Sequence, residues 1–474
     1  MHILKNMHYW LTKFFCEVGS MVDAHIKKLA DLGVLLPEIL IPDNGIDMTK
    51  WSVVACDQYT SSPEYWEKVE RIVGSSYSTY HITLPEIYLE REDVSDRIIK
   101  INKNMQEYLN HNILKALKPG LILVKRTTNN AKTRKGIILA VDLEKYDYSL
   151  SSTSLIRATE GTVVERIPPR LKVRENAAIE CPHVMLLIDD PERTVIEPLF
   201  EKCSMFDKIY DFELMMNGGR VEGYHVFDDL SISSFAKALD NLADIELYQK
   251  KYDVSDNNVL LFAVGDGNHS LATAKAHWEK IKCSIPCSEY DSYPARYALA
   301  EVVNLHDDGL VFEPIHRVLF NCDVEKTLDD MSMFYNFGCE IDCMTFGDKE
   351  TMDEEAKALA KEKNCHIIKY VTSTEYGLFA IYEPPHTIET GTLQYFLDEY
   401  IAEHSEIKID YIHGEDCVLE LSSKPGNIGF LLPSIDKNSL FKTVINNGVL
   451  PRKSFSMGEA DEKRFYLECR KIVP

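Results

Sequence analysis

The sequence predicts a mixed fold, α/β to α+β, because short apolar strands alternate along it with amphipathic helices. Residues 120–128, 134–146 and 183–190 have the pattern of strands, and two of these runs are nearly all apolar and therefore buried. Residues 92–114, in contrast, place apolar side chains at helical spacing. A sheet core flanked by helices follows from this order.

Length and charge exclude several classes of protein. The chain has 474 residues, which at about 150 residues per domain predicts two or three domains. Its 52 Lys and Arg against 75 Asp and Glu give a net charge of −23, which argues against binding to nucleic-acid phosphates or to an anionic membrane surface. No run approaches the ~18 apolar residues of a membrane helix. We therefore expect a cytoplasmic protein with neither a nucleic-acid nor a membrane partner; the oligomeric state is not indicated.

Three regions are expected along the chain. Residues 1–20 form an N-terminal extension, and Met21 is an alternative start. Residues 21–321 form the mixed α/β core. After Asn321 amphipathic helices alternate with short strands, so residues 322–474 are expected to form a C-terminal α+β domain.

The cysteines predict free thiols and no metal site. The 12 cysteines are dispersed over the whole chain, as is usual in a reducing compartment. Cys283 with Cys287 and Cys339 with Cys343 have one residue more between them than the usual short zinc knuckle, and other ligands are absent nearby in sequence.

A cationic block interrupts the acidic sequence between two predicted strands. Residues 157–174 contain five cations against two acids. Arg166 and Arg170 flank Pro168-Pro169, which stiffens the connection. Guanidinium groups match phosphate and carboxylate oxygens in pairs, so the block is a candidate anion site. The alternative is a solvated segment whose arginines pair with surface acids.

The most informative segment runs from Asn257 to Lys282. Apolar residues 259–264 predict a buried strand, Gly265 and Gly267 permit a sharp turn, and a helix is expected to begin near His269, capped by Asp266 or Asn268. Such a turn directs N–H groups and the positive helix end at one point, where a phosphate or carboxylate can bind. His269 and Ser270 can add donors. The alternative is a strand end and helix cap without a ligand.

Familiar motifs do not account for this turn. A dinucleotide fingerprint needs a small third residue where Ser270 stands and occurs near the start of a Rossmann unit. The sequence also contains no P-loop, HExxH or GxSxG pattern.

Further on, His316-Arg317 follows an apolar stretch and is either part of an anion site or a strand end.

Several blocks in one order resemble a known family. They are GDGNHS (265–270), WSVVACDQYTSSPEYW (51–66), RATEGTVVERIPPR (157–170), VNLHDDGLVFEPIHRVL (303–319), IDYIHGED (409–416) and LPRKSF (450–455). The chain resembles the domain-of-unknown-function 1015 family, whose turn usually reads ADGHHR. The turn is also similar to the phosphate-binding element of the superfamily of ParB nucleotide-binding domains, sulfiredoxin and free serine kinases, which implies a mixed-sheet core of that type.

This resemblance implies a nucleotide site. Asp266, Gly267, Asn268, His269 and Ser270 would lie against the phosphates of ATP or ADP, with Mg²⁺. Asn268 stands where sulfiredoxin has its reactive cysteine, which argues against sulfinic-acid reduction. The arginine of the family pattern is replaced by Ser270, so a guanidinium must come from elsewhere. Arg166, Arg170 or Arg317 could supply it. His316, next to Arg317, is a further candidate for contact with the nucleotide.

The expected activity is nucleotide-dependent phosphoryl transfer to a small hydroxyl-bearing metabolite, similar to that of the free serine kinases. Such a reaction needs a carboxylate to orient or deprotonate the attacking hydroxyl. Glu160, inside the cationic block, and Asp57, after the apolar run VVAC, are the candidates. Two alternatives remain open: a phosphohydrolase or NTPase that uses the same anion site with water as acceptor, and a non-catalytic module gated by nucleotide binding.

Overall fold

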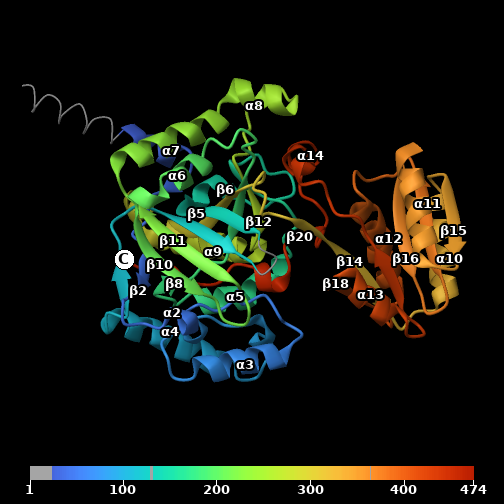
Figure 1. The fold of residues 1–474 in the computed structure, drawn as a ribbon, viewed down its shortest axis with the longest axis horizontal. Helices are drawn as coiled ribbons and strands as arrows, with labels where there is room; N and C mark the ends of the chain where they lie inside the picture. The colour runs from blue at the N-terminus through green and yellow to red at the C-terminus, as the bar shows by residue number, and fades with distance from the viewer. Residues whose placement is uncertain (1–23, 129–131, 363–364) are drawn as a thin grey trace, which may run out of the picture. The chain divides into compact units, whose positions relative to one another are not determined.

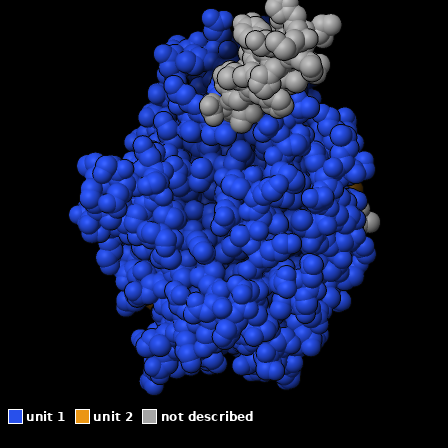
Figure 2. Space-filling view, turned by 90° about the vertical axis from the view of Figure 1, so that its left-hand side faces the viewer, with its two compact units in different colours: residues 1–310, 444–448, 460–474 blue, residues 311–443, 449–459 orange. Residues whose placement is uncertain are grey.

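The computed structural model describes residues 24–128, 132–362 and 365–474. The predicted extension 1–20 and the alternative start at Met21 lie outside these residues. The chain, drawn as a ribbon in Figure 1, divides into two compact units. Figure 2 shows a face that belongs almost entirely to unit 1, in blue. Unit 1 runs to Leu310 and also contains Val444–Gly448 and Ala460–Pro474, whereas unit 2 comprises Val311–Thr443 and Val449–Glu459.

Unit 1 is built on a mixed sheet, which confirms the predicted fold class. Within this sheet, β12 (Phe262–Asp266) runs parallel to β7 (Ile156–Ala158) and antiparallel to β9 (Met185–Ile188). The full order is β10-β11-β4-β5-β13-β9-β12-β7-β6, and β1 also pairs with β5. The remaining strands are β1 (Val34–Leu35), β4 (Leu121–Thr127), β5 (Thr133–Asp142), β6 (Tyr146–Asp147), β10 (Asp207–Glu213), β11 (Arg220–Val226) and β13 (Tyr297–Asn304).

Helices pack on this sheet around an apolar core. Trp51, Trp66 and Tyr108 are buried in it, and they come from α2 (Met48–Trp51), α3 (Pro63–Val73) and α4 (Val94–Asn110). These three helices lie together in Figure 1. Unit 1 also contains α5 (Ile167–Arg174), α6 (Glu197–Glu201), α7 (Asp229–Leu242), α8 (Ile245–Tyr252) and α9 (Asn268–Lys282), whereas α14 (Leu440–Asn447) is divided between the two units.

The segment 460–474 completes unit 1. Tyr466 N–H donates to Val53 O at 2.8 Å, and Leu40 and Cys469 exchange both backbone hydrogen bonds at 2.8 Å. Short β21 (Arg470–Lys471) then pairs with β8 (Ile179–Glu180), while β2 (Leu40–Pro42) pairs with β3 (Leu114–Ala116). The prediction of a single C-terminal domain over 322–474 therefore needs correction, because these backbone hydrogen bonds tie 460–474 to the first unit.

Unit 2 has its own antiparallel sheet, in the order β15-β17-β16-β19-β14-β18, with β20 paired to β14. It begins at Val311, earlier than the predicted boundary after Asn321, because β14 belongs to this sheet. Its strands are β14 (Phe312–Phe320), β15 (Ile341–Phe346), β16 (Cys365–Val371), β17 (Tyr376–Tyr382), β18 (Lys408–His413), β19 (Ile428–Leu431) and β20 (Phe455–Met457). Its helices include α10 (Val324–Asn336), α11 (Lys349–Glu362), α12 (Glu389–Glu403) and α13 (Glu415–Ser422). Among the described residues of both units, no helix is long and apolar enough to cross a membrane.

Candidate functional site

The turn between β12 and α9 has the backbone geometry that the glycines predict. Gly267 has a φ of +80°, in the left-handed region, and a Cβ there would lie 3.0 Å from Val184 Cα. Only glycine combines this conformation with so close an approach. The helix begins at Asn268, and among the described residues no side chain caps it. The expected cap by Asp266 or Asn268 is therefore wrong, since Asp266 Oδ1 instead accepts from Gly267 N–H at 2.9 Å.

The loop that follows β7 is held against this turn. Thr159 Oγ1 donates to Val264 O at 2.6 Å, and Val163 N–H donates to His269 Nε2 at 3.2 Å. Because β7 and β12 are parallel neighbours, their carboxyl ends meet at one sheet edge, where α/β proteins commonly bind ligands. The structure thus brings the loop containing Glu160 next to the turn. Asn268 Oδ1 is buried there without a hydrogen-bond partner among the described residues.

Segment 460–474 supplies a cation to the same turn. Lys463 Nζ lies 3.0 Å from Asp266 Oδ2, and only 7% of the Lys463 side chain is exposed. Asp266 is thereby fixed by its own turn on one oxygen and by an ammonium group on the other. A buried ammonium beside a helix N-terminus adds positive potential at the point where an anion would bind.

Asp57 forms an ion pair with His183 beside the turn. His183 Nε2 lies 3.5 Å from Asp57 Oδ2, and its Nδ1 lies 2.8 Å from the Tyr466 hydroxyl. The His183 ring also borders the turn, with Cδ2 3.5 Å from where a Gly267 Cβ would be. The site therefore joins a carboxylate, an imidazole and the helix start.

The two partners shift each other's pKa. Burial would raise the pKa of Asp57, but the charge and hydrogen bond of His183, with help from Gln58 and Lys463, outweigh burial and hold that pKa well below its ordinary value. Burial would lower the pKa of His183, but Asp57 outweighs it and raises that pKa. An ionised carboxylate of this kind can orient or deprotonate a hydroxyl group.

Arg170 lies at the edge of this group. Its Nε donates to Glu86 Oε1 at 2.7 Å, and Glu86 N–H donates to Cys56 O at 2.8 Å, next to Asp57. Arg166 is exposed, and its backbone carbonyl accepts from Arg170 NH1 at 2.7 Å. The ion pair of Arg170 agrees with the interpretation that arginines of the cationic block pair with acids of the protein. Its place beside Asp57 agrees with the interpretation of the block as an anion site.

A family model described as a protein of unknown function (DUF1015) matches residues 40–400, more than half of the chain. The chain belongs to the DUF1015 family. A search of the curated proteins finds no match.

Solved structures with similar folds are distant from this DUF1015 chain. A conserved hypothetical protein from Pyrococcus furiosus is 13% identical, and the match covers 70% of this chain and 90% of that chain at a TM-score of 0.34. Free serine kinase in complex with AMP is 11% identical, with 71% and 92% covered and a TM-score of 0.38. SbnI with a C-terminal truncation, from Staphylococcus aureus, is 7% identical, with 69% and 85% covered and a TM-score of 0.34. At such low TM-scores these likenesses carry no argument about activity.

His316 and Arg317 lie in unit 2 of the DUF1015 chain, on β14. Arg317 is fully buried, where its Nε donates to Gln394 Oε1 at 3.3 Å and its guanidinium carbon lies 5.0 Å from the Tyr411 ring centroid. His316 Nδ1 accepts from Leu432 N–H at 3.1 Å, and burial lowers its pKa to about 4. Both side chains therefore have partners within unit 2, and an anion-binding role for them stays a prediction.

The sequence did not single out two residues that the DUF1015 site contains. They are His183, next to Pro182, and Lys463, in the charged run 461–464. Lys463 lies 197 residues from its partner Asp266, so no local spacing connects them. His183 directly precedes the apolar run 184–188 and Lys463 directly follows two acids, and neither pattern by itself predicts a site.

Proposed function

We propose that unit 1 binds a nucleotide at the turn 266–270 and transfers a phosphoryl group to a small hydroxyl-bearing metabolite in the cytoplasm. One observation carries the proposal. Helix α9 starts at the left-handed Gly267 without a side-chain cap among the described residues, and Lys463 and His183 adjoin that start. A helix N-terminus of this kind favours phosphate oxygens.

The proposed phosphate contacts divide between backbone and side chains. The N–H groups of residues 268–270 would bind phosphate oxygens, with the Ser270 hydroxyl and Lys463 as further donors. Arg166, which is exposed, and Arg170 would neutralise charge from the edge of the site. Within 24–128, 132–362 and 365–474 there is no group of three or more His, Cys, Asp or Glu that could hold a metal ion. Mg²⁺ is commonly held by phosphates with one or two carboxylates, so we propose that it enters with the nucleotide.

Asp57 is the better supported of the two candidate carboxylates. Its pKa is held low by His183, which keeps it ionised, and it can accept a hydrogen bond from an acceptor hydroxyl. Glu160 lies in the loop beside the turn and would orient the acceptor or the nucleotide. Replacing Asp57 by Asn preserves its shape but removes the charge, so we expect turnover to fall by about 10²–10⁴-fold with little change in nucleotide affinity.

The first experiment is a thermal-shift screen with ATP, ADP, CTP and GTP in the presence of Mg²⁺. A ligand that binds the folded chain alone raises its Tm. We expect a shift with at least one nucleotide, and its loss in Gly267→Ala and His269→Ala. His269→Gln, which retains an acceptor for Val163 N–H, is the matched control and should keep most of the shift.

Product analysis then separates the three activities. A phosphorylated hydroxyl compound supports phosphoryl transfer, whereas free phosphate alone supports the hydrolase. Binding without turnover above that of Asp57→Asn supports the binding module. If no nucleotide changes the Tm of the wild-type chain, the proposed phosphate site is contradicted.

A further inference from the structure

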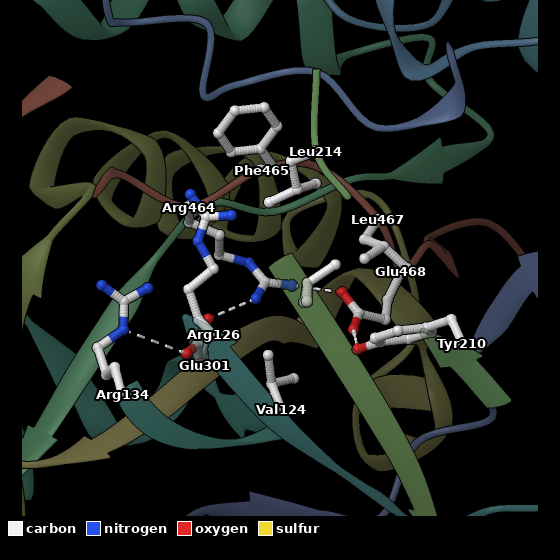
Figure 3. A pocket seen from close by; sticks show the side chains of 11 residues that line it. Val124, Arg126, Arg134, Tyr210, Leu214, Glu301, Arg464, Phe465, Leu467 and Glu468 are labelled. Carbon is white, nitrogen blue, oxygen red and sulfur yellow. Dashed lines mark hydrogen bonds and ion pairs between the residues drawn. The ribbon is translucent and has the colours of Figure 1, made fainter. Parts of the chain in front are cut away.

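A second cluster of charged side chains is buried in unit 1. It surrounds a cavity of about 20 Å³ (Figure 3). Apart from Leu214, which follows β10, the lining side chains come from strands of the large sheet and from the segment 460–474. Those with charge are Arg126, Arg134, Glu301, Arg464 and Glu468.

Most of these charges are paired with one another. Arg464 NH1 donates to Glu301 Oε2 at 2.5 Å, and Arg464 also pairs with Glu468. The remaining oxygen of Glu468 accepts from the Tyr210 hydroxyl. Figure 3 shows these contacts as a chain of dashed lines across the cavity. One guanidinium therefore pairs with both carboxylates of the cluster.

Arg126 is the exception. It is 3% exposed, and only its NH2 has a hydrogen bond, to Asp461 O at 3.0 Å. Its Nε and NH1 are buried without a partner among the described residues. Arg134 Nε likewise lacks a hydrogen bond and lies 3.8 Å from Glu301 Oε1. Leaving a buried charged donor unpaired is costly, so these groups call for a partner.

We propose that the cavity binds a monatomic anion of the halide class, chloride in the cell, between Arg126 and Arg134. The lining side chains carry three positive charges and two negative ones, so a monovalent anion makes the cluster neutral. A cavity of about 20 Å³ holds one particle the size of a water molecule. Chloride is only slightly larger than water, whereas acetate, phosphate or a nucleotide would not fit.

The donors and acceptors at the cavity favour an anion over water. Three nitrogen donors at the cavity have no hydrogen-bond partner among the described residues, Nε and NH1 of Arg126 and Nε of Arg134, whereas Glu301 Oε1 is the one lining acceptor in that state. A water molecule would leave the charge of Arg126 uncompensated. Burial and the charge of Arg134 lower the pKa of Arg126 to about 9, although Glu301, Asp461 and Glu462 act in the opposite direction. The guanidinium is thus still charged at neutral pH.

An anion there would also stabilise the segment that reaches the candidate site. Arg464 Nε donates to Pro182 O at 3.1 Å, next to His183, and Lys463 directly precedes Arg464. Phe465 lies against Arg126, with 4.9 Å from the guanidinium carbon to the ring centroid. Binding at the cavity would therefore fix the backbone that carries Lys463 to Asp266.

Bromide provides the test, because it replaces chloride and is visible by anomalous diffraction. Crystals of the full chain grown or soaked in sodium bromide should show an anomalous peak between Arg126 and Arg134. In solution, sodium chloride should raise the Tm more than sodium gluconate at the same ionic strength. A cavity that holds only water, with equal Tm in chloride and gluconate, overturns the proposal, as does a bromide peak found only elsewhere.

Variants locate the effect. Arg126→Gln should abolish the difference between chloride and gluconate, whereas Arg220→Gln, an exposed arginine on the neighbouring strand, should retain it. Retention of the full difference in Arg126→Gln would overturn the assignment to this cavity. If Arg126→Gln does not fold, the bromide map of the wild-type chain decides the question alone.

Discussion

The Lys463 ammonium lies 3.0 Å from Asp266 Oδ2, so the segment 460–474 is joined by an ion pair to the turn that begins α9. This contact spans 197 residues of sequence. It makes the geometry of the candidate site depend on a segment that follows unit 2 along the chain.

Removing one member of that pair should destabilise unit 1. We expect Lys463→Met and Asp266→Asn each to cost about 2–3 kcal/mol, because each leaves a largely buried partner without its counter-charge. The double variant should cost less than the sum, as a double-mutant cycle by chemical denaturation would show. Strictly additive costs would contradict a direct interaction.

Gly267→Ala should lower the stability of its unit more than an alanine at another glycine with the same φ. Gly267 and Gly426 both have a φ of +80°, but the nearest contact of an added Cβ is 3.0 Å at Gly267 and 3.7 Å at Gly426. The left-handed conformation alone costs about 1–2 kcal/mol, and the contact with Val184 adds to it at Gly267. Calorimetry of the two variants gives the comparison; equal losses would mean that the backbone at 183–184 relaxes freely.

The Asp57–His183 pair should give unit 1 a defined pH dependence. The lowered pKa of Asp57 contributes stability that is present above its ordinary value of 3.8 and is lost as the pH falls through the folded value. The raised pKa of His183 contributes stability that is present below 6.5 and is lost as the pH rises through the folded value. The Tm difference between wild type and His183→Gln should therefore be largest between these limits and shrink toward alkaline pH.

His277, in the same unit, is a control because its pKa is shifted in the opposite direction to that of His183. Burial, with the charge of Arg174, lowers the pKa of His277 to about 4. Its neutral form therefore favours the folded state above pH 6.5, and this contribution declines as the pH falls toward 4. Relative to His277→Gln, the wild type should lose stability on acidification. If the Tm difference from wild type changed with pH in the same direction for His183→Gln and His277→Gln, the proposed charge state of His183 would be excluded.

The variant Arg317→Met tests whether Arg317, which the sequence predicts to bind an anion, instead has a structural role. We expect Arg317→Met to cost unit 2 about 1–3 kcal/mol, because it leaves buried acceptors such as Gln394 Oε1 unpaired. Nucleotide affinity should not change. Weaker nucleotide binding with an unaltered calorimetric transition of unit 2 would instead support the anion-binding prediction.

The sequence predicted the elements around the site where the information is local. The strand expected at 259–264 is observed as β12 (Phe262–Asp266), and the helix expected near His269 begins at Asn268. Glycine conformation, apolar runs and helical spacing decide such elements within a few residues.

Pairing between distant segments could not be predicted in the same way. Arg157 belongs to the cationic block, but it is buried and its NH2 donates to Asn258 O, so it serves the packing of β7 against the segment before β12. Arg174 pairs with Glu180. Acids that only the folded chain brings near decide which cations of the block remain available to bind an anion. The positions of Lys463 and His183 depend on the same long-range pairing.

The discontinuity of unit 1 has a consequence for the order of protein synthesis. A ribosome makes residues up to Leu310, then all of 311–443, before it reaches the segment 460–474 that covers Val53 and Leu40 and carries Lys463. Unit 2 can fold as soon as its strands emerge, whereas the first-made unit must wait for the last-made segment. The candidate site is therefore incomplete in every nascent chain shorter than 463 residues.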